Sequence, residues 1–375
     1  MKIWIDGYEA NVPQRLGSSQ VAYELIRSLE KLDQKNEYTI FLPSSPMEDM
    51  PQEREGWKYK ILRPSKLWTR ITLPFALYFA RIKPDLFFSP THYVPRFCPV
   101  PKVVTIFDLS FLQFPEMFNK GDLYKLTNWT KFSVLNSQHV LTISNFTKKD
   151  LIKQYKLKAD KITIFYPGFD QTVFRPIKNS SQIKKIQDKY GIVGRYIIFI
   201  GTIQPKKNII RLMEAVKNIE DLKLVVVGKT TGPGREAWQF QEILQTPQKL
   251  DIPERVIFPG FVPTEELPCL LSGAAAFVLP SLWEGFGIPV VEAMATGTPV
   301  VVSNVSSLPE VVGKAGLLID PYSVTQIEQA IRAVINDKKL NEALSKLGLQ
   351  QAQKYSWETA AKVVLSTFTK LVKEA

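Results

Sequence analysis

The chain has 375 residues, 45% of them hydrophobic and 22% charged, which is typical of a water-soluble globular protein. This length exceeds what one hydrophobic core usually supports, so two domains are expected. No apolar run reaches the roughly 18 residues that a membrane-spanning helix needs, and the first ten residues lack the long apolar segment of a signal peptide. A cytoplasmic protein is therefore expected. Cys98 and Cys269 have no Cys-x-x-Cys context, which argues against a disulfide framework and a zinc site.

The net charge of +12 is uneven along the chain. Residues 1–180 carry 26 Lys and Arg against 17 Asp and Glu, a balance of +9, whereas the remainder carries 22 against 19, a balance of +3. An anionic membrane surface or an acidic substrate fits this excess, and residence near the inner membrane face is one expectation. The sequence has no zinc-finger spacing, no heptads behind a basic region and no RNA-binding aromatic signature, so no nucleic-acid partner is expected.

Short strand-like runs alternate with helical patterns from the first residues onward. In chain order these runs are KIWID, YTIFL, KYKIL, DLFFS, KVVTIF, HVLTI and KITIF, and then YIIFIG, LKLVVVG, RVIFPG, AAFVLP, PVVVS and GLLID. Alternation of this kind predicts two α/β domains, each with a mostly parallel, doubly wound sheet. The polar, aperiodic stretch after Pro167 marks the boundary, which gives domains of residues 1–178 and 179–355. Ligands lie at the carboxyl ends of such strands, so two facing domains would share a cleft.

Three stretches of the first half have more than one interpretation. The loop around Gly17 enters a helix for which Ser18 or Ser19 is the expected cap. Residues 66–83 are apolar around most of the helical circumference with basic ends, which favours a helix buried against the sheet but also fits a membrane or a lipid-linked acceptor. Residues 123–132 interleave aromatic and basic side chains, a pattern that interfacial helices share.

The second half opens with a strand, a loop and a helix in residues 196–215. The loop contains Lys206 and Lys207, and the helix begins near Asn208. Two lysines between a strand and a helix suit a diphosphate, because a buried double negative charge needs cations beside the helix end. A pair of solvated surface lysines is the alternative.

Residues 280–302 form the most informative stretch. A strand stops at Pro280, a turn holds Glu284, Gly285 and Gly287, and a helix through Glu292 opens at Pro289. Glycines ahead of a helix leave bare N–H groups at its positive end, where phosphate binds, and carboxylates accept hydrogen bonds from vicinal hydroxyls. A nucleotide sugar has this layout of diphosphate and diols. Taken alone, an ordinary strand–helix junction with two solvated glutamates also fits.

The same stretch, EGFGIPVVEAMATGTPVV, has two glutamates in E-x7-E spacing and resembles the donor-site signature of the retaining family-4 glycosyltransferases. The resemblance extends through residues 303–321 and 260–267, and a weaker resemblance covers nearly the whole chain. It implies a GT-B fold of two Rossmann-like domains facing across a cleft, with the final helix, from about residue 356 to 375, crossing back to the first domain. The first domain would bind the acceptor and the second the nucleotide-sugar donor.

The resemblance also implies roles for particular residues. Lys207, Glu284 and Asp108 become the catalytic candidates, with the leaving diphosphate taking the acceptor proton in a front-face attack. The donor-binding candidates are Gly17, Thr202, Lys206, Lys207, Glu284, Gly285, Phe286, Gly287 and Glu292. Neither a metal nor any other cofactor is expected, because lysines occupy the phosphate loop and no acidic pair has metal-ligand spacing. The implied reaction moves a hexose, mannose or another, to a glycan or lipid-linked hydroxyl in cell-surface polysaccharide or glycolipid synthesis.

Two positions depart from the family pattern. Relatives carry an arginine where this chain has Thr202, and many carry a histidine where it has Phe107. Either the donor sugar lacks a polar group at that point, as a 6-deoxy sugar would, or another residue such as His92 supplies the hydrogen bond. A GT-B sugar-nucleotide epimerase and a catalytically degenerate sugar-nucleotide-binding scaffold therefore stay open as alternatives to a transferase.

Overall fold

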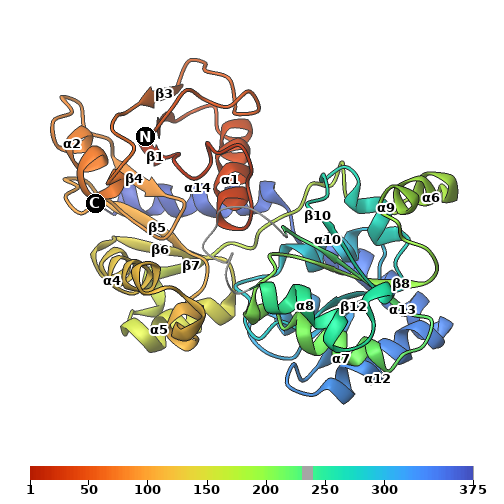
Figure 1. Ribbon diagram of the computed structural model, residues 1–375. Helices are drawn as coiled ribbons and strands as arrows, with labels where there is room; N and C mark the ends of the chain where they lie inside the picture. Colours follow the sequence, from red (N-terminus) through yellow and green to blue (C-terminus); the bar gives the residue numbers. More distant parts are fainter. Residues whose placement is uncertain (230–239, 375) are drawn as a thin grey trace. The chain divides into compact units, whose positions relative to one another are not determined.

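The computed structural model describes residues 1–229 and 240–374. The chain divides into two compact units (Figure 1). The first contains Met1–Gly168 and Ser356–Ala375, and the second contains Phe169–Tyr355. None of the described helices combines the length and the apolar character that crossing a bilayer requires.

The first unit is built on a seven-stranded sheet in which every neighbouring pair is parallel, in the order β3-β2-β1-β4-β5-β6-β7. The strands are β1 Lys2–Asp6, β2 Glu37–Leu42, β3 Trp57–Ile61, β4 Leu86–Ser89, β5 Lys102–Ile106, β6 His139–Thr142 and β7 Ile162–Ile164. They coincide with the seven runs predicted from the sequence. Residues of β4 and β6 are buried on both faces, as expected for inner strands of a parallel sheet that helices cover.

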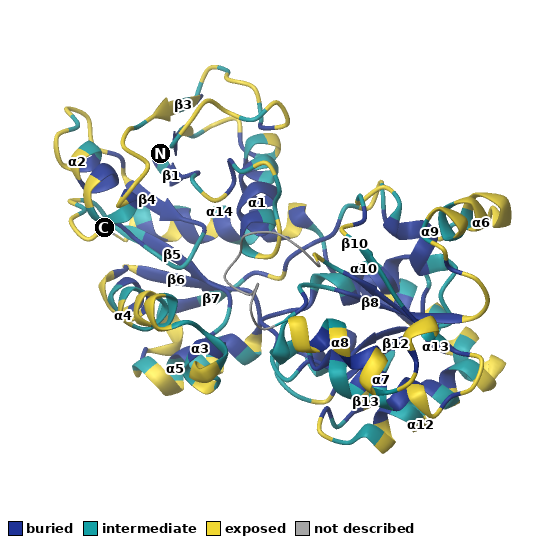
Figure 2. Cartoon of the chain, in the orientation of Figure 1, coloured by how far each residue is buried: buried dark blue, intermediate teal, exposed yellow. Residues whose placement is uncertain are grey.

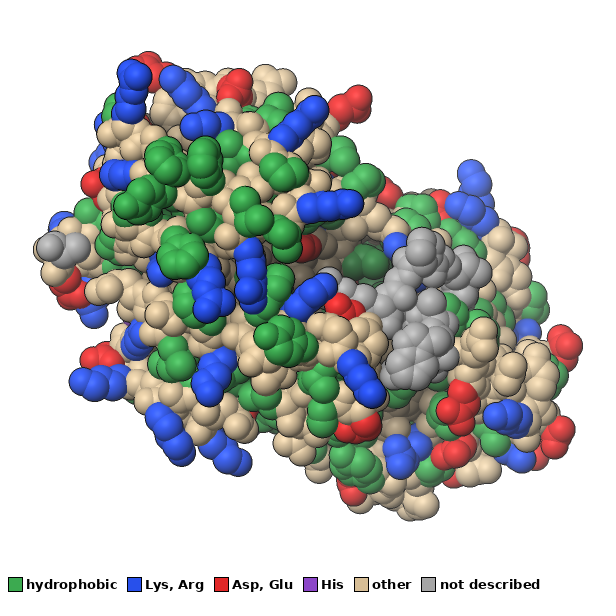
Figure 3. All heavy atoms as spheres, turned by 60° about the vertical axis from the view of Figure 1, so that its left-hand side comes forward, with side chains coloured by type: hydrophobic (Ala, Val, Ile, Leu, Met, Phe, Trp, Pro, Cys, Tyr) green, Lys and Arg blue, Asp and Glu red, His purple; other side chains and the backbone are tan. Residues whose placement is uncertain are grey.

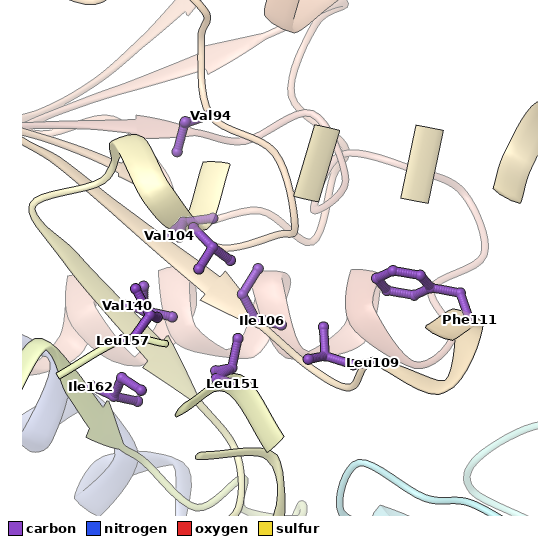
Figure 4. Close-up of a cluster of buried hydrophobic side chains, with 10 residues drawn as sticks. Val94, Val104, Ile106, Leu109, Phe111, Val140, Leu151, Leu157 and Ile162 are labelled. Carbon is purple, nitrogen blue, oxygen red and sulfur yellow. The ribbon is translucent and has the colours of Figure 1, made fainter. Parts of the chain in front are cut away.

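Helices connect these strands and bury apolar side chains against the sheet. They are α1 Ser18–Leu32, η1 Trp68–Thr72, α2 Leu73–Tyr78, α3 Ser110–Gln113, η2 Pro115–Met117, α4 Lys120–Asn136, α5 Asn145–Tyr155 and η3 Ala159–Lys161. Figure 4 shows one of the resulting clusters, in which Val104 and Ile106 of β5 lie with Val140 of β6 and Leu151 of α5. This core fixes the end of β5, which the candidate residue Asp108 follows.

The last helix of the chain, α14 Trp357–Lys373, belongs to the first unit. Its N-cap is Ser356, whose hydroxyl accepts a hydrogen bond from the Thr359 N–H. The helix packs on α1, and Phe368 meets Phe88 of β4 with ring centroids 5.1 Å apart. The predicted return of the C-terminal helix to the first domain is confirmed.

The second unit has a six-stranded sheet in the order β10-β9-β8-β11-β12-β13, again parallel throughout. The strands are β8 Tyr196–Ile200, β9 Lys223–Val227, β10 Val256–Gly260, β11 Phe277–Leu279, β12 Val300–Ser303 and β13 Gly316–Ile319. The helices are α6 Ser180–Lys189, η4 Pro205–Lys207, α7 Ile209–Lys217, α8 Gln241–Lys249, η5 Pro253–Arg255, α9 Leu267–Ser272, α10 Ile288–Ala295, α11 Leu308–Val312, α12 Val324–Asn336 and α13 Lys338–Ala352. Figure 2 shows the sheet as the buried layer and the helices as half-exposed covers. The predicted pair of doubly wound domains is confirmed.

One local prediction was wrong, and another was right for only one face of its segment. Helix α1 begins at Ser18 with Gly17 as its cap, and the hydroxyl of Ser19 bonds with Leu16, because a φ of +55° at Gly17 turns the chain without a side-chain cap. Residues 66–83 form η1 and the short helix α2 in place of a single helix, and the inner face of this segment is buried against the sheet, as the sequence favoured. Leu73 and Leu77 are buried, whereas Phe75 and Phe79 are exposed.

Candidate functional site

The second unit has a reversal of strand order at the neighbouring strands β8 and β11. Ligands of open parallel sheets bind at such a switch point, outside the carboxyl ends of the strands. The chain leaves β8 at Ile200 and β11 at Leu279. Residues 201–208 and 280–287 therefore meet where a ligand is expected, and they contain most of the predicted donor-binding residues.

Glu284 and Lys207 join these two loops. The Lys207 ammonium lies 2.5 Å from Oε1 of Glu284, and the side chains are only 13% and 10% exposed. The Ser281 hydroxyl donates a second hydrogen bond of 2.7 Å to the same oxygen. A half-enclosed lysine held at a strand end by one carboxylate is a cation that an incoming phosphate can reach through its remaining N–H donors.

The turn that carries Glu284 is held from the far side by two serines. The Glu284 N–H donates to Oγ of Ser306, and the hydroxyl of Ser307 donates to the carbonyls of Glu284 and Phe286. Ser307 is fully buried, so these bonds are shielded from water. The serines belong to the part of the sequence that resembles the family, but nothing in their spacing indicates this contact.

Gly285 and Gly287 place backbone N–H groups at the start of α10. Gly287 has a φ of +100°, which strongly favours glycine, and the helix follows at Ile288 with Pro289 in its first turn. Among the described residues, none accepts a hydrogen bond from the N–H of Gly285 or of Gly287. Phe286 is buried, with its ring 5.3 Å from that of Tyr355, so its side chain anchors the turn. Donors ahead of a helix of this kind suit an anionic oxygen.

Glu292 lies in α10, about one turn beyond the glycines. It is half-buried, and no hydrogen bond within the described part of the chain involves its carboxyl group. Burial raises the pKa of Glu292 to about 8. A carboxyl group with this environment has oxygens available for hydroxyl donors and is mainly protonated at neutral pH until a ligand stabilises its charge.

The remaining residues of the β8 loop have structural roles that can be named. Gln204 donates to Oγ1 of Thr202 over 2.6 Å, and the carbonyl of Lys206 accepts the Leu282 N–H. The Asn208 amide donates to the carbonyls of Pro280 and Pro321, so one side chain ties together the loops that follow β8, β11 and β13. The sequence places Asn208 near the start of a helix and gives no sign of these two hydrogen bonds.

The first unit also has a switch point, between β1 and β4. The loop after β1 leads to Gly17, where the positive φ opens α1. At the end of β1, Asp6 accepts hydrogen bonds from the Tyr8 N–H and from the indole N–H of Trp68. Burial is the main cause that raises the pKa of Asp6 to about 7. The sequence did not single out Asp6, because a carboxylate at the end of a strand gives no sign of its burial.

Phe107 and Asp108 follow β5, the next strand of the sheet. Oδ1 of Asp108 accepts the Ser110 N–H over 2.8 Å. The Phe107 side chain is 7% exposed and its ring centroid lies 5.5 Å from that of His92, which is in the loop after β4. The structure therefore places His92, the alternative hydrogen-bonding residue considered from the sequence, next to Phe107, which occupies the position of the family histidine.

No cluster of three or more His, Cys, Asp or Glu side chains within the described ranges has the geometry to hold a metal ion. The predicted residues thus fall into two sets. One contains Gly17 and Asp108 in the first unit. The other, in the second unit, contains Thr202, Lys206, Lys207, Glu284, Gly285, Phe286, Gly287 and Glu292.

Comparison with known proteins agrees with this arrangement. Residues 182–351 match the family "Glycosyl transferases group 1", and residues 16–173 match "Glycosyltransferase Family 4". The O-antigen chain mannosyltransferase B of Escherichia coli is 30% identical over 288 residues, which is 76% of this chain and 74% of that protein.

Two solved structures have the same fold. The sucrose-phosphate synthase of Thermosynechococcus elongatus covers 100% of both chains with a TM-score of 0.80 and 19% identity. Anabaena HepE, solved in complex with UDP-glucose, covers 99% of this chain and 100% of its own with a TM-score of 0.76 and 20% identity. Because the family matches together span most of the chain, the protein belongs to the family-4 glycosyltransferases of GT-B fold and is an enzyme that depends on a nucleotide sugar.

Proposed function

We propose that the protein moves a hexose from a nucleotide diphosphate sugar to a hydroxyl group of a glycan or lipid-linked acceptor, with retention at the anomeric carbon. The observation that carries this proposal is the Lys207–Glu284 pair at the β8–β11 switch point, beside the N–H groups of Gly285 and Gly287. The relationship to an O-antigen mannosyltransferase supports a role in surface polysaccharide synthesis, with mannose as one candidate sugar.

Each residue of the second unit has a distinct proposed task. Lys207, with Lys206 beside it, neutralises the diphosphate, whose charge grows as the bond to the sugar breaks. The N–H groups of Gly285 and Gly287 bind phosphate oxygens, and Glu292 accepts hydrogen bonds from the ribose diol. Glu284 holds Lys207 with one oxygen and offers the other to a sugar hydroxyl. In this scheme residues 179–355 bind the donor and residues 1–178 the acceptor, with Asp108 and Gly17 contributed by the first unit.

A thermal-shift screen with UDP, GDP, ADP and their sugars identifies the donor. A ligand at a hundred times its dissociation constant stabilises the folded protein by about 2.7 kcal/mol, so the correct nucleotide gives a clear rise in melting temperature. The same donor is then incubated with candidate acceptors. Transfer requires that free nucleoside diphosphate and a glycosylated acceptor appear together, in equal amounts, only when both substrates are present.

The two alternatives give different results in this assay. An epimerase would convert the sugar while it stays attached to the nucleotide, with no acceptor needed. A scaffold would bind the donor without releasing the diphosphate under any condition. Either result, obtained with a donor that raises the melting temperature, would contradict the proposed transfer.

We expect activity without a divalent metal. Lys206 and Lys207 supply positive charge where a metal would otherwise bridge the phosphates, and the described residues contain no acidic cluster for a metal. Turnover should be unchanged when the protein is dialysed against EDTA and measured with EDTA present. A loss that magnesium or manganese restores would show that the lysines do not suffice.

We expect His92 to make the polar contact with the transferred sugar that Phe107 cannot make. One hydrogen bond contributes about 1 kcal/mol, so His92→Ala should lower kcat/KM about fivefold. Adding Phe107→His should restore part of the loss, since the rings of His92 and Phe107 are neighbours. The alternative is tested by competition between matched 6-hydroxy and 6-deoxy donors. If the wild type prefers the 6-deoxy sugar and only Phe107→His reverses this preference, then Phe107, and not His92, determines which sugar is bound.

A further inference from the structure

A continuous run of large apolar side chains is exposed on the first unit, outside the predicted sites. It follows η1, α2 and the residues after α2, and each of its members is between 52% and 66% exposed. We call it the apolar strip, and it consists of Leu67, Ile71, Phe75, Tyr78, Phe79 and Ile82. Phe75 and Phe79 lie one helical turn apart with ring centroids 4.5 Å from each other. Soluble monomers seldom leave such a patch without a partner.

The strip belongs to a firmly seated element. On the inward side of the same segment, Trp68, Leu73 and Leu77 are buried in a core cluster with Phe41 and Phe87. The Trp68 indole also donates a hydrogen bond of 2.8 Å to buried Asp6 at the end of β1. The outward rings are therefore held in place by an anchored inner face, so their exposure is a property of the fold.

The strip lies in a strongly basic part of the sequence. Residues 56–107 contain nine Lys and Arg residues and one acidic residue, Asp85, and residues 63–83 contain five basic residues and no acidic one. Figure 3 brings the side of α2 forward, and there Lys and Arg side chains lie among hydrophobic ones. A surface with exposed apolar rings, many basic side chains and very few acidic ones is complementary to a partner that is both apolar and negatively charged.

A pocket of about 280 Å³ opens beside the strip, between η1, the loop after β4 and α4. Arg70 and Arg96 line it together with Tyr93, Asn128 and Trp129. The Arg70 guanidinium lies 4.3 Å from the centroid of a Trp129 ring, and within the described ranges neither arginine forms an ion pair. Two arginines without a carboxylate partner, in a hollow with polar and aromatic walls, suit a phosphate group.

We propose that the apolar strip and the Arg70–Arg96 pocket form one docking surface for an anionic lipid bilayer. The rings of Phe75, Tyr78 and Phe79 enter the boundary between headgroups and acyl chains, while Arg70 and Arg96 bind lipid phosphates at its edge. A second copy of the chain is a poor occupant, because self-association through this face would bring Arg70, Arg81 and their counterparts together without acidic groups between them.

Flotation with vesicles tests the proposal on the full chain. The wild-type protein should float with vesicles that contain about 30 mol% phosphatidylglycerol in phosphatidylcholine, and high salt should weaken this binding. Phe75→Ser/Phe79→Ser should reduce binding at least tenfold. The control Val193→Ser/Tyr322→Ser removes two comparably exposed apolar side chains from the second unit and should bind as the wild type does. Equal melting temperatures exclude a folding defect.

A second pair of variants separates charge from apolar contact. Each basic side chain near an anionic surface strengthens binding roughly fivefold, so Arg70→Gln/Arg96→Gln should bind more weakly and with a smaller salt dependence. Lys338→Gln/Lys346→Gln, which removes two charges from the second unit, should have little effect. Unchanged flotation of the phenylalanine variant would overturn the proposal. So would a dimer of the wild type that this variant dissociates, since the strip would then be a protein interface.

Discussion

Lys207→Ala is expected to lower kcat about a hundredfold or more while donor affinity falls much less, since the stabilisation of developing charge is worth about 3 kcal/mol in comparable sites. The diphosphate gains charge as it leaves the sugar, and Lys207 stands at the strand end where this charge would form. In the free protein its charge is balanced by Glu284 over 2.5 Å. Steady-state kinetics together with direct measurement of donor binding separates the two effects.

The ion pair requires controls for stability. Without Lys207, the enclosed Glu284 carboxylate keeps Ser281 as its one side-chain donor among the described residues, and this loss by itself destabilises the turn. Rates are therefore compared well below the melting temperature of the variant. Lys207→Arg should recover part of the rate because it restores the charge, and Lys206→Ala should cost less than Lys207→Ala. Equal losses in kcat/KM and in donor affinity would make Lys207 an anchor for the ground state only.

Glu292→Gln should weaken nucleotide binding by about 1–3 kcal/mol, because a carboxylate accepts two hydroxyl hydrogen bonds from a ribose diol and a glutamine can accept only through its carbonyl. The side chain keeps its size, and no described residue bonds to the carboxyl group. The comparison therefore reports on the ligand. Titration calorimetry with the nucleoside diphosphate measures the change, and unchanged affinity would remove Glu292 from the site.

The raised pKa of Glu292, about 8, gives this prediction a pH dependence. Binding that stabilises the charged form releases a proton at pH 7, so affinity should rise between pH 6.5 and 8 in the wild type and stay flat in Glu292→Gln. For the free protein, the raised pKa contributes stability that is complete below the ordinary value of 4.5 and is lost as the pH rises through 8. Asp6, whose pKa is raised from 3.8 to about 7, adds its own loss below pH 7, so Glu292→Gln should reduce the fall between pH 4.5 and 7 and remove the contribution of Glu292 between pH 7 and 8. Calorimetry in two buffers of different ionisation enthalpy counts the released protons.

The sequence predicted both sheets because buried parallel strands are short apolar runs, and each run has one strand in the structure. It also placed Lys207 and Glu284 in separate strand–helix loops. The sequence could not predict that these two side chains meet, because the order of strands along the chain does not determine which strands are neighbours in the sheet. The contacts of Asn208 and Ser307 that support this pair also depend on which strands are neighbours in the sheet.

The segment from residue 66 to 83 shows a second limit. An apolar pattern around a helix fits burial on all sides, and it equally fits a helix with one face in the core and the other on the surface. Which of the two arrangements occurs depends on what covers the outer face of the helix. The sequence of a segment does not reveal this, because it does not say which other segments pack against it. Only the structure separates Leu73 and Leu77 from Phe75 and Phe79.

The placement of α14 has a consequence for how the protein is made. Residues 1–168 leave the ribosome first, yet Phe88 and the outer side of α1 are covered by a helix near the end of the chain. At a synthesis rate of about 5–20 residues per second, the first unit waits about 10–40 s for that helix. The second unit, being continuous in sequence, can complete its fold during this interval. We therefore expect the second unit to reach its final structure before the first, and a chain that stops ahead of residue 357 to lack the helix that packs on α1 and Phe88.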